Sequence, residues 1–352
     1  MKTKDRVLEI LTGSKGSPVS GEKLAEECSV SRAAIWKTVN SLRSAGFVIE
    51  GTTNGGYAIK ESGDIFSKEL LSSYFKTNFQ SFKDSRIEVY SEIDSTNTQA
   101  RRELTEAGAL RDENGELTEA GKKHHKSFIV AEKQTAGRGR LGRTFVSPAK
   151  TGIYLTIIYA PKGGITDPAK LTAFAAVAVC RAVKKLCNTQ PKIKWINDIF
   201  AGGKKICGIL TEGFANFETG RIDSAYVGIG INIKDNPEVF KGDVAKVAGS
   251  ILSSAEKSRE SPKRHEIAAE VAGQFLTLME SEPEKIISEY KENSFLIGQT
   301  IEVHPVIGDE KKIYKAKAVD IDDDAGLVVE LSDGTRKTLR SGEVTLKSYQ
   351  FV

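Results

Sequence analysis

The stretch Glu132–Arg143 reads EKQTAGRGRLGR and alternates the arginines Arg138, Arg140 and Arg143 with three glycines. Glycine allows backbone conformations that other residues avoid, and it lets main-chain N–H groups approach a ligand closely. Arginine presents a planar fork of donors that matches phosphate and carboxylate oxygens. The combination predicts a mobile basic loop that closes over an anion, with a solvated basic turn as the plain alternative. The stretch lacks the Gly-Lys-Ser/Thr ending of a Walker phosphate loop.

Two further polar clusters follow predicted strands. Residues 94–97 read DSTN after the strand IEVYSEI, and residues 194–198 read KWIND, followed by a turn that carries Lys204 and Lys205. Ser, Thr and Asn are favoured helix caps, and a helix N-terminus offers free N–H donors to a ligand. An aspartate at a strand end can hold Mg²⁺, and a nearby lysine can act as a point charge on a carboxylate or phosphate. Each feature alone also fits a solvated turn.

The elements that must position these residues alternate between strands and helices. FIVAE, GIYLTIIYA, ICGILTEGF and AYVGIGINI are apolar runs of strand length, and LTAFAAVAVCRAVKKLC is a predicted buried helix. This alternation predicts an α/β mixed-sheet catalytic domain over residues 86–292.

The N-terminal residues 1–62 show a different pattern. A Gly-Ser-Pro break and the caps Ser20 and Ser31 separate three predicted helices. FVIEG and GYAIK then flank the turn Thr53-Asn54-Gly55-Gly56, which predicts a hairpin. Three helices and a hairpin predict a winged helix-turn-helix DNA-binding domain. Its third helix would enter the major groove with Ser31, Arg32, Ala33 and Lys37, the lysine facing a phosphate. A helical module that contacts protein instead of DNA is the alternative.

Residues 63–85 are predicted to form a linker with one short helix. From residue 293 to 352 the chain turns to short β runs separated by turns, which predicts an SH3-like β-barrel. The predicted fold class is therefore α+β and multidomain, with a winged helix, a catalytic domain and a small β domain in that order.

Residues 101–126 form an unusual insertion, in which LTEAG occurs at 104–108 and again at 117–121. We expect an exposed helix–turn–helix excursion. It ends in Lys122, Lys123, His124 and His125. Adjacent histidines on a helix point in different directions, so a solvated surface is favoured over a metal site.

Bulk properties fit an ordinary globular protein. The 352 residues carry a net charge of +4, which is too small to imply polyanion binding by itself. Cys28, Cys180, Cys187 and Cys207 form no CxxC pair, so neither a disulfide framework nor a zinc site is indicated. The N-terminal sequence lacks the apolar core of a signal peptide, and we find no apolar run of membrane-spanning length. A cytoplasmic protein is expected, with no membrane partner.

Taken together, five motifs in order resemble the bifunctional biotin protein ligases, which are also repressors of the biotin operon. The motifs are DSTN at 94–97, GRGRLGR at 137–143, KWIND at 194–198, KKICGIL at 204–210 and GIGIN at 228–232. The resemblance covers essentially the whole chain. Lipoate ligases are similar in the catalytic core but differ at the arginine loop and lack the winged helix.

The resemblance implies an enzyme that forms biotinyl-5′-AMP from biotin and Mg-ATP and passes the biotinyl group to a lysine of a biotin carboxyl carrier protein. It implies catalytic roles for Arg140, Lys205 and Asp198, with Asp198 also serving Mg²⁺. It implies biotin contacts from Ser95, Thr96, Asn97, Gln134, Gly137, Arg138, Gly139, Lys205 and Gly208. It implies ATP contacts from Arg138, Arg140, Lys194, Asn197 and Asn232.

The resemblance also implies regulation. Biotinyl-AMP would act as corepressor by stabilising a homodimer, and the two winged helices would then bind a palindromic operator. The alternatives are an inactive biotin-sensing repressor and a lipoate-type ligase. Two departures from the family pattern stand out: Ile196 replaces a common proline, and Phe145 replaces a common tryptophan.

Overall fold

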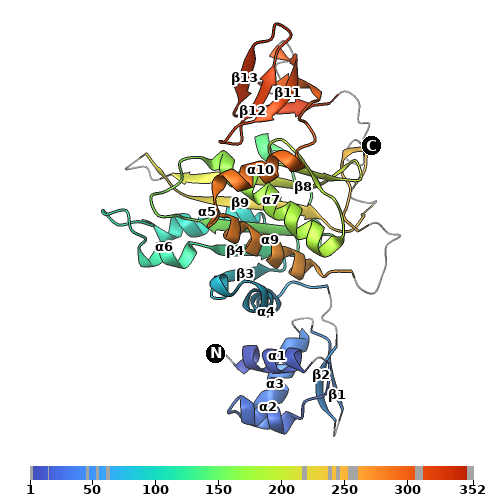
Figure 1. Ribbon diagram of the computed structural model, residues 1–352. Helices are drawn as coiled ribbons and strands as arrows, with labels where there is room; N and C mark the ends of the chain where they lie inside the picture. Colours follow the sequence, from blue (N-terminus) through green and yellow to red (C-terminus); the bar gives the residue numbers. More distant parts are fainter. Residues whose placement is uncertain are drawn as a thin grey trace. The chain divides into compact units, whose positions relative to one another are not determined.

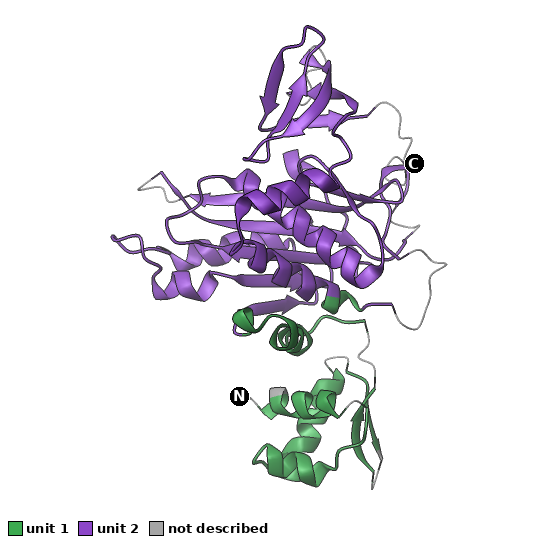
Figure 2. Cartoon of the chain, in the orientation of Figure 1, with its two compact units in different colours: residues 1–83, 263–266 green, residues 84–262, 267–352 purple. Residues whose placement is uncertain are grey.

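The computed structural model describes residues 3–14, 16–44, 47–52, 55–60, 64–215, 220–236, 240–242, 246–252, 261–305 and 312–346. The chain divides into two compact units (Figure 2). Residues 1–83 with 263–266 form the first unit, and residues 84–262 with 267–352 form the second.

The first unit begins with the three predicted helices and the predicted hairpin (Figure 1). Ser20 caps the second helix by accepting a hydrogen bond from the Lys23 N–H. Residues 53 and 54 of the predicted turn lie outside the described residues, but the strands on either side pair antiparallel. The elements are α1 Thr3–Gly13, α2 Gly21–Glu27, α3 Arg32–Ser44, β1 Ile49–Thr52 and β2 Gly56–Ile59.

Apolar side chains spaced by three or four residues on α3 form the centre of this unit. Ile35, Val39 and Leu42 are fully buried, together with Leu24 of α2. The predicted short helix of the linker is α4 (Lys68–Asn78), followed by the 3₁₀ turn η1 (Gln80–Phe82). Leu70 of α4 packs against the same core, so this segment is part of the first unit.

The second unit is built on a seven-stranded mixed sheet, as predicted for the catalytic domain. The strand order is β3-β4-β5-β9-β8-β7-β6, and only the β3–β4 pair is parallel. The strands are β3 Ile87–Tyr90, β4 Ser127–Ala131, β5 Gly152–Tyr159, β6 Lys192–Lys194, β7 Asp198–Ala201, β8 Lys204–Ala215 and β9 Ile222–Asn232.

Helices cover both faces of this sheet (Figure 1). Gly228 of β9 faces Asn97 of the helix α5, whereas Thr211 of β8 bonds Thr172 of the helix α7. Leu210 of β8 pairs with Gly228, so the side chain of the next residue, Thr211, points to the other face of the sheet. The helices α5 and α7 therefore lie on opposite faces. The helices of this unit are α5 Thr96–Ala107, α6 Glu119–His124, α7 Pro168–Cys187, α10 Pro283–Asn293 and nearly all of α9 Arg264–Leu278.

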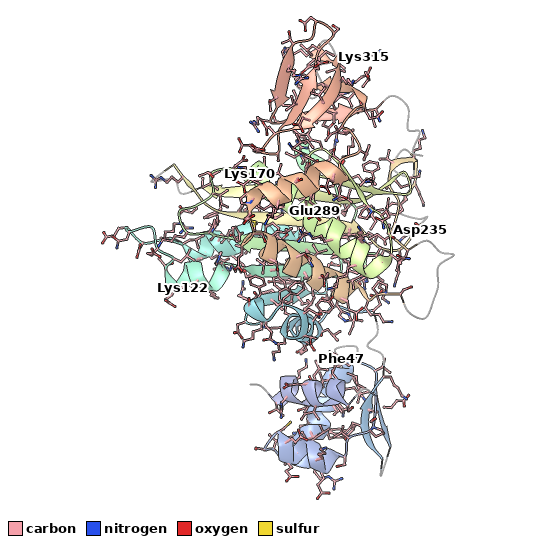
Figure 3. All side chains as sticks on the ribbon, in the orientation of Figure 1. Phe47, Lys122, Lys170, Asp235, Glu289 and Lys315 are labelled. Carbon is pink, nitrogen blue, oxygen red and sulfur yellow. The ribbon has the colours of Figure 1, made fainter. Side chains whose placement is uncertain are left out.

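Residues 101–126 depart from the exposed excursion that we predicted. The first LTEAG ends α5 at Gly108, whose φ of 70° needs glycine, while the second leads into α6. A Cβ on Gly121 would lie 2.1 Å from the Leu110 carbonyl oxygen, so the second glycine allows close packing. Only part of the segment is solvated: Lys122 is 62% exposed (Figure 3).

The histidine prediction in this segment is wrong. His124 is only 5% exposed, and His125 accepts a hydrogen bond at Nδ1 from the Ala160 N–H at 3.1 Å. The His125 ring also packs against Tyr159, with ring centroids 5.2 Å apart. Burial lowers the pKa of His125 from 6.5 to about 4. His125 follows directly after α6, and its contacts with Ala160 and Tyr159 hold its ring against the end of β5.

Because His125 is buried in its neutral form, we expect the free energy of unfolding to decrease as the pH is lowered. The unfolded chain binds the extra proton between pH 6.5 and about 4, so the free energy of unfolding falls as pH falls through that window. His125→Asn keeps an acceptor for Ala160 but does not titrate, and should show a shallower loss in urea denaturation across the same window. An identical pH dependence in both proteins would contradict this prediction.

The C-terminal part is a five-stranded antiparallel sheet with the order β13-β12-β11-β10-β14. Alternate apolar residues such as Ile301, Val303, Leu327 and Val329 are buried on one face. The strands are β10 Thr300–His304, β11 Tyr314–Ile321, β12 Leu327–Glu330, β13 Arg336–Leu339 and β14 Glu343–Thr345. Among the described residues of the whole chain, we find no helix with the length and apolar character needed to cross a bilayer.

Candidate active site

A cleft in the second unit gathers most of the side chains that the motifs predicted. Of these predicted residues, it is lined by Ser95, Thr96, Asn97, Gln134, Arg138, Gly139, Arg140, Asn197, Asp198, Lys205 and Gly208. The remaining lining residues are Arg143, Thr144, Phe145, Tyr154, Leu155, Ile209, Leu210, Gly228, Ile229, Gly230 and Glu343. Gly137, Lys194 and Asn232 do not line it.

One end of the cleft is polar and lies at the N-terminus of α5. Ser95 is the N-cap of this helix, and its hydroxyl faces the Thr98 N–H. Ser95, Thr96 and Asn97 are each less than 5% exposed. Gln134 accepts a hydrogen bond from the Thr96 N–H at 2.9 Å and donates one to Ser147 Oγ at 2.8 Å. This end therefore offers several oriented donors and acceptors within a small buried space.

The floor of the cleft depends on two glycines of the GIGIN motif. A Cβ at Gly228 would lie 2.2 Å from Asn97 Oδ1, and one at Gly230 would lie 2.5 Å from the Phe145 ring. Both glycines point to the same face because they are two residues apart on β9. From the sequence we predicted a role for Asn232 of this motif and none for the glycines. Their spacing of two within a predicted strand was the available signal.

The arginine loop lies over this floor. A turn at its tip is closed by bonds from the Gly139 N–H to the Arg143 carbonyl at 2.7 Å and from the Arg143 N–H to the Arg140 carbonyl at 3.2 Å. Gly142 has a φ of 74°, as the glycine spacing anticipates. Gly137 lies outside the lining and packs tightly against the loop itself, since its Cβ would be 2.2 Å from the Phe145 carbonyl oxygen.

Each cation of the loop has a partner in a different element. Arg138 Nη2 lies 3.0 Å from Glu212 Oε1 on β8. Arg140 donates to Asn197 Oδ1 at 2.9 Å and to the Gly342 carbonyl at 3.3 Å. These contacts hold the guanidinium groups of Arg138 and Arg140 in the lining of the cleft.

The third arginine of the loop, Arg143, pairs with Glu343 of the C-terminal sheet, and one of its two bonds measures 2.8 Å between Nη2 and Oε2. Burial raises the pKa of the Glu343 carboxyl, but the hydrogen bond and the positive charge from Arg143 outweigh this and leave it below its ordinary value.

The Arg143–Glu343 pair predicts that the C-terminal sheet restrains the loop. In Glu343→Gln, trypsin should cleave after the loop arginines about two to five times faster, because a partly exposed ion pair contributes about 0.5–1 kcal/mol. Glu330→Gln is the matched control, since Glu330 pairs with Arg336 within the C-terminal sheet. Equal cleavage rates in wild type and Glu343→Gln would show that the pair does not restrain the loop.

The lysine and aspartate of the two downstream motifs meet at the cationic end of the cleft. Lys205 Nζ lies 2.6 Å from Asp198 Oδ1, so the two side chains form an ion pair. The contact does not have the geometry of a hydrogen bond. Asp198 begins β7 and pairs in register with Gly208 of β8. A Cβ on Gly208 would lie 3.5 Å from Lys205 Nζ, so this glycine keeps the space beside the ammonium open.

The predicted ATP contacts Lys194 and Asn232 lie next to the cleft without lining it. Lys194 pairs in register with Asp198, and burial lowers the pKa of its ammonium while the Asp198 charge opposes the shift. Asn232 is the last residue of β9, and its carbonyl accepts from the Ile251 N–H at 3.0 Å. The sequence identified the right strand ends, but not which side chains reach the cavity.

Among the described residues, no group of three or more His, Cys, Asp or Glu side chains could hold a metal ion. The acidic side chains that line the cleft are Asp198 and Glu343. One or two carboxylates fit a Mg²⁺ ion that arrives with substrate phosphates and keeps several waters, rather than an all-protein cage.

The predicted DNA-contacting residues lie on the exposed side of α3. Ser31, Arg32, Ala33 and Lys37 are all exposed, and Ser31 Oγ accepts from the Ala34 N–H at 3.2 Å. The buried Ile35, Val39 and Leu42 occupy the other side of the helix. The first turn of α3 is thus free to approach a ligand.

Comparison with protein families matches three parts of the chain in order. Residues 3–58 match an HTH domain, residues 93–232 match the Biotin/lipoate A/B protein ligase family, and residues 297–347 match the Biotin protein ligase C terminal domain. This chain belongs to the biotin protein ligase family. Every residue predicted for the cleft lies within the central match.

Full-length relatives share this arrangement. The chain is 29% identical to the bifunctional ligase/repressor BirA of Bacillus subtilis, covering 94% of this chain and 95% of the relative. It is 27% identical to BirA of Escherichia coli, covering 94% and 93%. The fold of the biotin protein ligase from Aquifex aeolicus superposes with a TM-score of 0.56 at 21% identity, covering 74% of this chain and 97% of that one.

Proposed function

We propose that this protein is a biotin protein ligase that forms biotinyl-5′-AMP from biotin and ATP and transfers biotin to a lysine of a biotin carboxyl carrier protein. The observation that carries the proposal is the make-up of one cleft. It combines a buried polar end, apolar side chains and a cationic end that contains Arg138, Arg140 and Lys205. Biotin has the matching parts: a polar ureido ring, an apolar ring and chain, and a carboxylate.

The polar end suits the ureido ring. Ser95, Thr96, Asn97 and Gln134 surround it, and the helix N-terminus of α5 adds oriented N–H groups. Phe145, Leu155 and Ile229 supply apolar surface further along the cleft. Gly139 and Gly208 leave room for ligand atoms beside the backbone, and Gly137 acts indirectly by supporting the loop and Gln134.

The cationic end suits the reaction. When a biotin carboxylate oxygen attacks the α-phosphorus, the bond from that phosphorus to the bridging oxygen breaks and pyrophosphate leaves with the electron pair. Negative charge grows on the phosphate oxygens during this step, and fixed cations stabilise that charge. Arg138, Arg140 and Lys205 lie at this end, so we assign Arg140 and Lys205 to the reacting groups. Asp198, which contacts Lys205, would orient that ammonium or receive the Mg²⁺ that enters as Mg-ATP. Lys194, Asn197 and Asn232 would contact ATP.

The mixed anhydride hydrolyses readily, so the site must exclude water after it forms. The arginine loop is the element that can do this, because it covers the cleft and carries its own glycines. In the final step the carrier lysine attacks the biotinyl carbonyl, and AMP leaves with the bonding electron pair.

Transfer to the carrier is the test of this proposal. The full chain is incubated with biotin, ATP, Mg²⁺ and a purified biotin carrier domain, and the carrier is weighed by mass spectrometry. We expect the mass to rise by one biotinyl group on one lysine. A carrier whose acceptor lysine is replaced by arginine should stay unlabelled, and an unlabelled wild-type carrier would overturn the proposal.

We further propose that the first unit binds operator DNA as a transcriptional repressor of biotin synthesis, with biotinyl-AMP as corepressor of a homodimer. The support is the exposed first turn of α3 and the match to an HTH domain. A palindromic operator would follow from two-fold symmetry. In the same proposal the protein acts in the cytoplasm, and its C-terminal sheet closes as an SH3-like barrel.

This repressor function predicts two separable effects on DNA binding. Lys37→Ala should weaken binding to all duplexes. It should also reduce the slope of the logarithm of the binding constant against the logarithm of salt concentration (the salt slope) by about 1, as expected for a lost phosphate contact. Arg32→Ala should reduce the free energy of binding to the preferred duplex by about 1–3 kcal/mol, and it should relax the sequence preference at one base pair. Fluorescence anisotropy with duplexes selected by the wild-type chain would measure both, with Lys76→Ala on α4 as the control. Unchanged salt slope and preference would contradict the assignment.

A further inference from the structure

A carboxylate behind the cleft contacts both a buried residue of the central domain and the arginine loop. Glu212 of β8 lies two residues after Leu210, so both side chains point to the face of the sheet that carries α5. Glu212 Oε2 accepts a hydrogen bond from Asn97 Nδ2 at 2.9 Å, and Asn97 is only 3% exposed. Glu212 is not among the residues that line the cleft, so it can act on a ligand only through its neighbours.

The same carboxylate holds both terminal nitrogens of Arg138. Arg138 Nη1 donates to Glu212 Oε2 at 3.2 Å, and Arg138 Nη2 forms an ion-pair contact with Glu212 Oε1 at 3.0 Å. A contact through two nitrogens fixes the plane of the guanidinium as well as its position. It takes up at most two of the five N–H donors of arginine. At least three therefore remain for an anion in the cleft, which Arg138 lines.

This contact ties the start of the arginine loop to the central sheet. Arg140 and Arg143 reach partners in the C-terminal part of the molecule, whereas Arg138 is held by a strand of the sheet that forms the cleft. A cation that is already oriented does not have to move when negative charge develops on the reacting groups, so it stabilises the transition state more effectively. Arg138 meets this condition through Glu212.

We infer that Glu212 is a positioning residue for adenylate formation, which holds the Arg138 guanidinium ready for the carboxylate and phosphate oxygens that react in the cleft. The inference rests on the proposed function, in which Arg138 lies at the cationic end that binds the reacting groups. The same carboxylate places a negative charge near an anionic substrate, and this charge opposes the binding of ATP. Glu212 should therefore raise the rate of the reaction without tightening the binding of ATP.

The decisive variant is Glu212→Gln, which removes the charge and keeps the shape. Its one oxygen can still accept from Asn97, and its amide nitrogen then faces Arg138 Nη2, donor against donor. We expect the maximal rate of first-turnover pyrophosphate release, at saturating biotin, to fall about tenfold. The ATP concentration for half-maximal rate should not rise, since a negative charge has been removed. An unchanged maximal rate, or a loss seen only as weaker ATP binding, would overturn the inference.

A cycle of two substitutions tests whether Glu212 acts through Arg138. In the Arg138→Ala background, Glu212→Gln should lower the maximal rate by less than about twofold, because the group that Glu212 positions is absent. The same tenfold loss in both backgrounds would show that Glu212 acts independently of Arg138, and the inference would be wrong. Absence of biotin-dependent release from the wild-type chain would refute the proposed function instead.

A matched control uses a second arginine–glutamate pair that lies outside the cleft. Arg181 of α7 contacts Glu289 of α10 through two nitrogens. These side chains are 38% and 28% exposed, close to the 39% and 22% of Arg138 and Glu212. Glu289→Gln should keep the maximal rate within about twofold of wild type. A loss equal to that of Glu212→Gln would show that the effect does not depend on Arg138, and would also refute the assigned role.

Trypsin cleavage after Arg138 in the ligand-free full chain is a second measurement, which needs no enzymatic activity. Trypsin must take up the arginine side chain, and the contact with Glu212 competes with this. Glu212→Gln should therefore be cleaved after Arg138 about two to five times faster than wild type. Equal cleavage rates would show that Glu212 does not restrain Arg138, and would overturn the inference whatever the kinetic result.

Discussion

Replacing Lys205 with alanine is expected to lower biotin-dependent pyrophosphate release by about 10²–10³-fold, the usual effect of losing one preorganised group that stabilises developing charge. Lys205 is a lysine that lines the cleft, and its ammonium lies at the cationic end beside Asp198. The negative charge on the α-phosphate grows during the attack, so the loss should appear in kcat more than in KM.

The neighbouring Lys204 provides the control for this variant. Lys204 does not line the cleft, and its Nζ donates to the Lys246 carbonyl. Lys204→Ala should stay within about twofold of wild type, since substitutions away from such sites usually have small effects. Equal losses in the two variants would mean that Lys205 acts through the general charge of this strand rather than at the reacting groups.

The second large effect is expected for Arg140→Gly, which should release free biotinyl-AMP about 10–100-fold faster than wild type. Arg140 combines contacts to Asn197 and to the Gly342 carbonyl, so it bridges the loop, the β6–β7 turn and the C-terminal part of the molecule. A hydrogen bond to a charged group contributes about 1.5–3 kcal/mol, which corresponds to that range of rates.

Release is measured by separating the protein from the reaction mixture and quantifying the adenylate in solution by mass spectrometry. Arg336→Gly is the control, because Arg336 is exposed on β13 and pairs with Glu330. The role assigned to Arg140 would be wrong if the variant held the intermediate as tightly as wild type. Labelling of bystander lysines should rise together with release, since the free anhydride acylates amines.

The elements of both units followed from local pattern. The three helices of the first unit were predictable because Ile35, Val39 and Leu42 repeat at helical spacing, and polar caps separate the helices. The strands of the central sheet are apolar runs of the expected length. Strand order was not predictable, because pairing such as β9 with β8 and β5 depends on contacts distant in sequence.

The insertion at 101–126 shows where local pattern fails. Its polar composition indicated a solvated excursion, yet Leu110 and His124 are buried. The decisive contact is the close approach of Gly121 to the Leu110 carbonyl, which is a tertiary feature. A histidine between lysines gives no sequence signal of burial.

The candidate site was predictable in part. Polar residues at strand ends and the arginine loop identified half of the residues that line the cleft. The residues that we did not predict act by supporting others. Gly228 and Gly230 leave space for Asn97 and Phe145, and Glu212 forms an ion pair with Arg138. Glu343, which pairs with Arg143, comes from the separate C-terminal sheet. Such roles depend on which side chains face each other across the sheet, so motifs alone could not supply them.

Pyrophosphate release from ATP by the purified full chain, measured with biotin and lipoate in parallel, tests most directly whether the cleft activates biotin. We expect release that depends on biotin and is stoichiometric with bound biotinyl-AMP when no carrier is present. We expect no comparable release with lipoate. Release with lipoate but not biotin, or tight biotin binding without release, would show that this cleft does not activate the biotin carboxylate.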